Sequence, residues 1–70
     1  MSKKLKLKEA RFALWLSQLE LYLKTGVSAS RISMIENKKL IPNVIERVKL
    51  AEALHLPVDG IDWPEIQKAS

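Results

Sequence analysis

The chain of 70 residues contains no cysteine and only one histidine, His55. Without a thiol, neither a disulfide nor a thiolate metal site can hold the fold together. Tetrahedral zinc sites are built mainly from cysteine and histidine, so we expect no metal site. The two glycines, Gly26 and Gly60, lie far apart, which excludes a glycine-rich loop that binds phosphate groups. We therefore expect no cofactor.

Long apolar runs are also absent. No stretch approaches the roughly 20 apolar residues that a membrane-spanning helix needs, so we expect no membrane partner. The basic start at residues 1–4 is not followed by the apolar segment of a signal peptide. These two absences predict a soluble cytoplasmic protein.

Residue types that serve in catalysis are present, but they are not arranged as an active site. His55 has no partner residue at a useful spacing. Glu46 and Glu52 are better explained as a helix cap and as part of a solvated face than as a general acid/base pair. We therefore expect neither an enzyme nor a small-molecule substrate.

The composition is typical of one small folded domain. Apolar residues make up 47% of the chain, which argues against disorder. Seventy residues allow one domain with one small core, so we assign residues 1–70 to a single domain. Within it, residues 1–4 form a basic arm and residues 62–70 form a C-terminal tail or short helix.

Positive charge is concentrated in the first part of the chain, although the net charge is only +4. Residues 1–39 carry nine Lys or Arg against three Glu, which gives +6, whereas residues 40–70 carry three basic against five acidic residues, which gives −2. A face that binds a polyanion requires such a basic region. A solvated lysine-rich surface explains the charge equally well.

Apolar spacing favours helices throughout, because no alternating run of the kind found in strands is present. From Leu5 to Leu14, the residues Leu7, Ala10 and Leu14 recur at spacings of three and four, and Phe12 widens this stripe. We predict a first helix here, and no strands.

A second helix is predicted from its capping residues. Ser17 is followed three residues later by Glu20, the pattern of a capping box, so the helix begins near Gln18. Gly26 ends it, because glycine readily adopts the left-handed conformation that follows many helices.

A third helix is predicted directly after a short Gly-Val-Ser turn. Ser28 caps this helix, which extends from about Ala29 to Asn37, and Ile32 and Ile35 form its buried side. Two short helices joined by such a turn are typical of a helix-turn-helix, whose second helix can lie in the major groove of DNA.

A fourth helix is predicted after the loop that ends at Pro42. Asn43, with Glu46 three residues later, caps this helix. A last short helix is predicted after Asp62, where Pro64 suits a first helical turn. The apolar face of the fourth helix is predicted to comprise Val44, Val48, Leu50, Ala51 and Leu54.

The ordered set of these residues resembles the Cro/repressor family, the lambda-repressor-like helix-turn-helix proteins of phages and bacteria. The resemblance implies a compact all-α domain of four to five helices that acts as a sequence-specific DNA-binding transcriptional regulator. It also implies binding to double-stranded DNA as a homodimer, without a cofactor. The resemblance is carried by Arg11, Ser17-Gln18, Leu21, Gly26-Val27-Ser28, Ile32-Ser33, Ile35-Glu36, Pro42, Leu50-Ala51-Glu52-Ala53-Leu54 and Leu56-Pro57-Val58-Asp59.

The resemblance further implies which residues contact DNA. The third helix would be the recognition helix, and Gln18 would touch a phosphate and brace a side chain of that helix. The implied contacts in the major groove are Ser28, Ala29, Ser30, Arg31 and Met34, and those to the DNA backbone are Asn37, Lys38 and Lys39.

The chemistry of these residues predicts modest sequence specificity. Arg31 is the one side chain able to pair with guanine O6 and N7, a contact worth about 1–3 kcal/mol of discrimination. Arg31 can equally well bind a phosphate, since half or more of such hydrogen bonds go to the DNA backbone. Ala29 and Met34 suit a thymine methyl group, and DNA shape supplies the remainder.

Four positions depart from the family pattern because they are apolar. Leu19 and Leu23 replace charged residues on the outer side of the second helix, Tyr22 replaces a small residue, and Trp15 replaces a small or polar one. These side chains either pack against the arm or the Trp63 segment as additional core, or form a protein-binding patch.

The chain end offers a second candidate interface. Trp63 and Ile66 either contact another protein or fold back onto the core. These apolar residues suggest an alternative function, a protein-interaction module on the same fold, such as an antitoxin or a modulator of a repressor.

Overall fold

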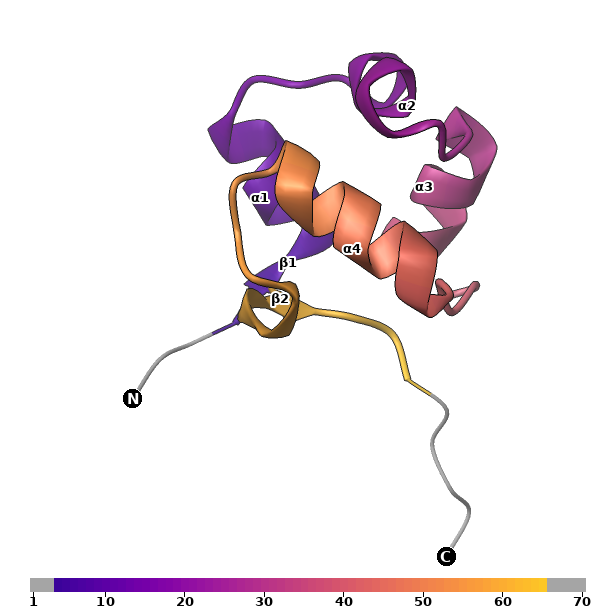
Figure 1. Cartoon of the computed structure of the whole chain (residues 1–70). Coiled ribbons are helices and arrows are strands. Elements are labelled where there is room, and N and C mark those ends of the chain that lie inside the picture. The colour runs from indigo at the N-terminus through magenta and orange to yellow at the C-terminus, as the bar shows by residue number, and fades with distance from the viewer. Residues whose placement is uncertain (1–3, 66–70) are drawn as a thin grey trace, which may run out of the picture.

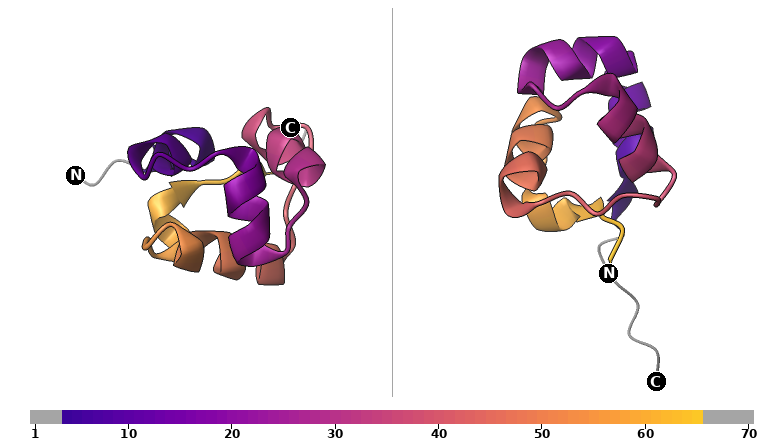
Figure 2. Two further views of the ribbon diagram at one scale, coloured as in Figure 1. Left: turned by 90° about the horizontal axis from the view of Figure 1, so that it is seen from above. Right: turned by 90° about the vertical axis from the view of Figure 1, so that its right-hand side faces the viewer.

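The structure is a computed structural model that describes residues 4–65, where four short α-helices dominate (Figure 1). α2 packs against both α3 and α4, and it lies across the space between these two helices (Figure 2). This arrangement confirms the predicted all-α class. The elements are β1 (Leu5–Lys6), α1 (Leu7–Ala13), α2 (Gln18–Thr25), α3 (Ala29–Glu36), α4 (Val44–Ala53), the 3-10 helix η1 (Val58–Gly60) and β2 (Ile61–Asp62).

The predicted boundaries of α2 are confirmed. The Ser17 hydroxyl accepts a hydrogen bond from the backbone N–H of Glu20 (3.0 Å), and the Glu20 carboxylate accepts one from the N–H of Ser17 (2.9 Å). These bonds satisfy donors that the first helical turn leaves free. Gly26 follows α2 with a φ of +79°, the left-handed conformation expected there.

The caps of α3 and α4 are also as predicted. The Ser28 hydroxyl accepts a hydrogen bond from the N–H of Arg31 (3.2 Å), and the Asn43 side chain accepts one from the N–H of Glu46 (2.8 Å). α3 therefore begins at Ala29, where the side-chain oxygen of the preceding serine can cap it.

Three other helices end at residues that are not glycine. Trp15, Lys38 and His55 follow α1, α3 and α4 with φ values of +58°, +59° and +59°. This left-handed conformation turns the chain out of a helix as Gly26 does, at a higher backbone energy for residues with a Cβ atom.

The prediction of no strands is wrong. β1 and β2 form a short parallel pair in which Leu5 aligns with Ile61 and Lys6 with Asp62. Strands of two residues are too short to show an alternating pattern, and their pairing joins distant parts of the chain. Because β1 occupies Leu5 and Lys6, α1 begins at Leu7 rather than at Leu5.

The last short helix predicted after Asp62 is absent from residues 63–65, and the rest of its predicted range lies outside the described residues. Asp62 belongs to β2, and residues 63–65 form no helix. Trp63 is only 8% exposed, and its indole N–H donates a hydrogen bond to the carbonyl oxygen of Val58 (2.8 Å). The interpretation of Trp63 as part of an exposed interface is therefore wrong, and its packing on the core is confirmed. Ile66 lies outside the described residues.

The core lies between the helices and includes the residues predicted for α3, Ile32 and Ile35. The predicted apolar faces of α1 and α4 are only partly buried: Phe12, Leu14, Val44 and Val48 are exposed. In these short helices, only a narrow face reaches the core. The other buried hydrophobic residues are Leu7, Ala10, Leu21, Val27, Leu50, Ala51, Leu54, Ile61 and Trp63.

A buried ion pair connects α1 to α3. Arg11 Nε and Nη2 donate to the two carboxylate oxygens of Glu36 at 2.6 and 3.1 Å, and the two side chains are 6% and 3% exposed. Arg11 Nη1 also donates to the carbonyl oxygen of Leu16 in the loop after α1 (2.8 Å). One guanidinium group thus holds α1, this loop and the C-terminal end of α3 together.

Removing one partner of this pair tests its role in stability. Glu36→Ala leaves the Arg11 guanidinium buried without its counter-charge, so we expect the free energy of unfolding to fall by about 3–5 kcal/mol. Urea titration followed by circular dichroism measures this change. The double variant Arg11→Met/Glu36→Leu removes both charges and should recover much of the loss. A Glu36→Ala variant as stable as the natural protein would contradict this role.

Candidate nucleic-acid interface

The turn between α2 and α3 is held by local hydrogen bonds and by packing. The Thr25 hydroxyl donates to the carbonyl oxygen of Leu21 (2.7 Å) and accepts a hydrogen bond from the N–H of Val27 (3.1 Å). Val27 and Thr25 are both buried. Buried contacts in this turn therefore fix the orientation of α3 relative to α2.

One side of α3 is exposed to solvent and carries both polar and apolar residues. Ile32 and Ile35 face the core, whereas Ser30 and Met34 are exposed. Since residues three and four apart share a face of a helix, Ser30 and Met34 lie on the same accessible side. The positions predicted to face DNA follow one another along this part of the chain: Ser28 caps α3, the next four lie on α3, and the last three follow it. Those on α3 are Ala29, Ser30, Arg31 and Met34, and those after it are Asn37, Lys38 and Lys39.

Gln18, which is predicted to contact a phosphate, forms a hydrogen bond with the buried Arg11–Glu36 ion pair. Its Nε2 donates a hydrogen bond to Glu36 Oε1 (3.0 Å), the same oxygen that Arg11 Nη2 contacts. Gln18 therefore braces a side chain at the end of α3 from the beginning of α2.

Arg31 is not a free cation, because it forms an ion pair with Glu46 of α4. Its Nε and Nη2 donate to the two Glu46 carboxylate oxygens at 2.7 and 2.9 Å. The hydrogen bond with Glu46 is the main cause of a raised pKa at Arg31. The pKa of Glu46 is lowered, chiefly by the hydrogen bond from Arg31 and also by the backbone N–H of Asn43, while burial acts in the opposite direction. The sequence spacing suggests only the capping role of Glu46, since its partner lies 15 residues away.

Two predicted backbone-contacting residues have partners of their own. Lys38 Nζ lies 3.4 Å from an Asp62 carboxylate oxygen, and about half of each side chain is exposed. Such an exposed pair is weak, so Lys38 remains available to another anion. The Asn37 side-chain NH₂ donates to the carbonyl oxygen of Ser33 (2.8 Å).

Comparison with known protein families matches this geometry. A family model described as helix-turn-helix covers residues 7–61 of the chain. The chain belongs to this family of lambda-repressor/Cro-like proteins. It is a DNA-binding transcription regulator of the helix-turn-helix type, a family whose members regulate rather than catalyse. The comparisons with curated proteins and with solved structures found no match.

Exposed apolar side chains lie on the outer side of α2 and in the loop before it in this helix-turn-helix protein. We call them the outer α2 patch: Trp15 in the loop, and Leu19, Tyr22 and Leu23 on α2. Trp15 is 91% exposed, and Leu19 and Leu23 are also mostly exposed. The interpretation of these four residues as additional core is therefore wrong. Leu19 and Leu23 lie on the side of α2 opposite to its buried residues Leu21 and Thr25, and Trp15 lies in the loop before α2, which explains this exposure.

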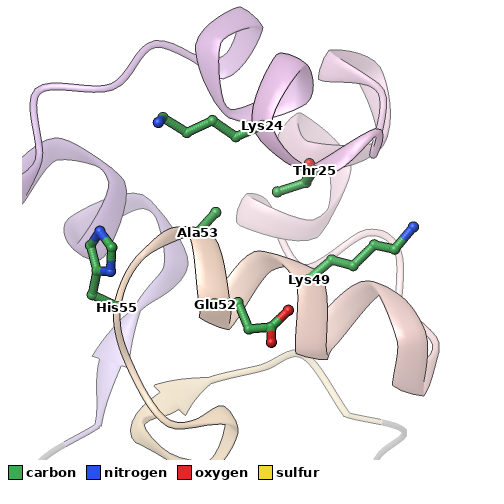
Figure 3. A pocket seen from close by; sticks show the side chains of 6 residues that line it. All are labelled: Lys24, Thr25, Lys49, Glu52, Ala53 and His55. Atoms are coloured by element: carbon green, nitrogen blue, oxygen red, sulfur yellow. The ribbon is translucent and has the colours of Figure 1, made fainter.

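A shallow hollow of about 520 Å³ lies between α2 and α4. Lys24 and Lys49 extend from the two helices in different directions, and His55 lies beyond the end of α4 (Figure 3). Between residues 4 and 65, no three His, Asp or Glu side chains gather closely enough to hold a metal ion. In the same range, the helices are all too short or too polar to cross a membrane.

The lowered pKa of Glu46 predicts how the stability of this helix-turn-helix protein depends on pH. Folding lowers the pKa of this carboxylate from its ordinary value of 4.5. Such a group stabilises the folded protein at pH values above 4.5. This contribution is lost as the pH falls through the lower pKa of the folded state. Glu46→Gln keeps a side-chain acceptor for the cap but carries no charge. We expect the variant to be less stable than the natural protein at pH 7, and the difference to shrink below pH 4.5. Urea titrations at pH 7 and pH 3 measure it; a constant difference would contradict the ion pair.

Proposed function

We propose that this protein is a sequence-specific transcriptional regulator of the Cro/repressor type that reads the major groove with α3. The observation that carries the proposal is the accessible polar side of α3, held rigidly by the buried turn and by the Arg11–Glu36–Gln18 contacts. A helix can enter the major groove only if one side is free of the core and its orientation is fixed.

The residues on this side define what the helix can read. Arg31 supplies the one bidentate donor for guanine, and the hydroxyl groups of Ser28 and Ser30 hydrogen-bond to several bases. Ala29 and Met34 offer apolar surface for thymine methyl groups. We therefore propose modest specificity that also depends on DNA shape.

The loop after α3 supplies contacts to phosphates. Asn37, Lys38 and Lys39 are exposed just beyond the end of α3, and Gln18 lies at the beginning of α2. Contacts of this kind position a protein on DNA and make its affinity fall with salt, by a slope near −0.9 per phosphate neutralised.

We propose that the protein binds its operator as a homodimer. One short α3 helix can place only a few side chains against base edges. Two copies of the protein would therefore be needed to recognise a longer DNA site. Exposed Ile41, Val44, Ile45 and Val48 on and beside α4 form an apolar surface that supports pairing of two copies. Half-sites about 34 Å apart would place one α3 in each of two successive major grooves. Selection of bound sequences from a random duplex pool measures this spacing directly.

The assignment of α3 is tested by Arg31→Ala. We expect this variant to lose about tenfold or more in affinity for a selected duplex, in line with one bidentate base contact. Fluorescence anisotropy at two salt concentrations measures it. Lys24→Ala is the matched control, because it also removes one positive charge but lies in the hollow beside α4 (Figure 3). Equal affinities of the Arg31→Ala variant and the natural protein would reject α3 as the reading helix.

A second function is supported by the outer α2 patch. Four exposed apolar side chains around one helix end are typical of an interface with another protein, such as a toxin or a repressor. The same anisotropy experiment distinguishes the two functions. A salt-dependent signal with duplex DNA at micromolar protein favours the regulator, whereas its absence favours the interaction module.

A further inference from the structure

We propose that Glu46 is a positioning residue that directs Arg31 to a guanine rather than to a phosphate. The inference rests on the proposed function of α3 in reading DNA. It assigns to a residue of α4 a part in setting sequence preference.

The geometry of the ion pair leaves the correct edge of Arg31 free. Glu46 accepts hydrogen bonds from Nε and Nη2, which form one side of the guanidinium group. The adjacent outer edge carries the second N–H of Nη2 and one N–H of Nη1, side by side. Recognition of guanine O6 and N7 requires two parallel donors, and this edge supplies them. Among residues 4–65, no hydrogen-bond partner occupies Arg31 Nη1.

The carboxylate of Glu46 is itself held in place. Its Oε1 accepts a hydrogen bond from the N–H of Asn43 (3.0 Å), and the N–H of Glu46 donates to the Asn43 side chain (2.8 Å). The Glu46 side chain is 13% exposed, whereas that of Arg31 is 42% exposed. Glu46 is thus the fixed inner partner and Arg31 the accessible outer one. A side chain held in this way loses less conformational freedom when it binds a base.

Electrostatics favours a base over a phosphate at this position. A phosphate carries a full negative charge that the fixed Glu46 carboxylate repels, whereas guanine O6 and N7 carry only partial charges. Without the carboxylate, Arg31 would gain freedom to swing toward the DNA backbone. Glu46 therefore separates the two roles that are open to an arginine at the start of a recognition helix.

The test compares the natural protein with Glu46→Gln and Arg31→Lys. A random duplex pool first yields the selected site, and anisotropy then compares that duplex with copies in which single guanines are replaced by adenine, at two salt concentrations. For the natural protein, we expect replacement of one particular guanine by adenine to weaken binding by about tenfold or more. Glu46→Gln should reduce that preference to about threefold or less and steepen the salt dependence by roughly one phosphate contact. Arg31→Lys keeps the charge but lacks the fork of donors, so it should lose the preference as well.

Three results would overturn the inference. Glu46→Gln could keep the full preference for guanine, or it could bind every duplex more tightly with an unchanged preference, which would make Glu46 a simple competitor of DNA. The selected site could also contain no guanine whose replacement by adenine weakens binding. Absence of salt-dependent duplex binding by the natural protein would reject both the proposed function and this inference. Circular dichroism and urea titration confirm that each variant is folded at the assay temperature.

Discussion

One buried ion pair, between Arg11 and Glu36, connects α3 to the rest of the fold. A buried pair of charges stabilises a fold only when further hydrogen bonds satisfy its remaining polar atoms. Here the carbonyl oxygen of Leu16 and the amide of Gln18 supply such bonds. The pair therefore connects α1, the loop after it, α2 and the C-terminal end of α3.

Local features of the fold could be predicted from the sequence, whereas contacts between distant residues could not. Ser17, Ser28 and Asn43 cap their helices as predicted because a cap involves only the next three residues. The pairing of β1 with β2 depends on residues 56 positions apart in the chain, as the alignment of Leu5 with Ile61 shows. The exposure of Phe12 could not be predicted from spacing either, because it depends on where the neighbouring helices lie.

The same distinction applies to the candidate site. The positions along α3 follow from the helix period, and the family match over residues 7–61 shows the helix-turn-helix to which they belong. The partner of Arg31 was not predicted, because Glu46 already had a local explanation as the third residue of α4. The ion pair links α4 to the N-terminal part of α3. The outer α2 patch was predicted as one of two alternatives, and only the structure decides for exposure. The molecule thus exposes a largely polar face on α3 and an apolar face on α2.

The central claim is that α3 and the loop after it contact DNA while the outer α2 patch does not. Titration of the isotopically labelled protein with the selected duplex, followed by the chemical shifts of backbone amides, tests this claim most directly. The account predicts the largest changes at Gln18, over residues 28–31 and at Lys38 and Lys39, with little change at Leu19 and Leu23. Changes confined to Leu19 and Leu23, or no changes at all, would contradict it.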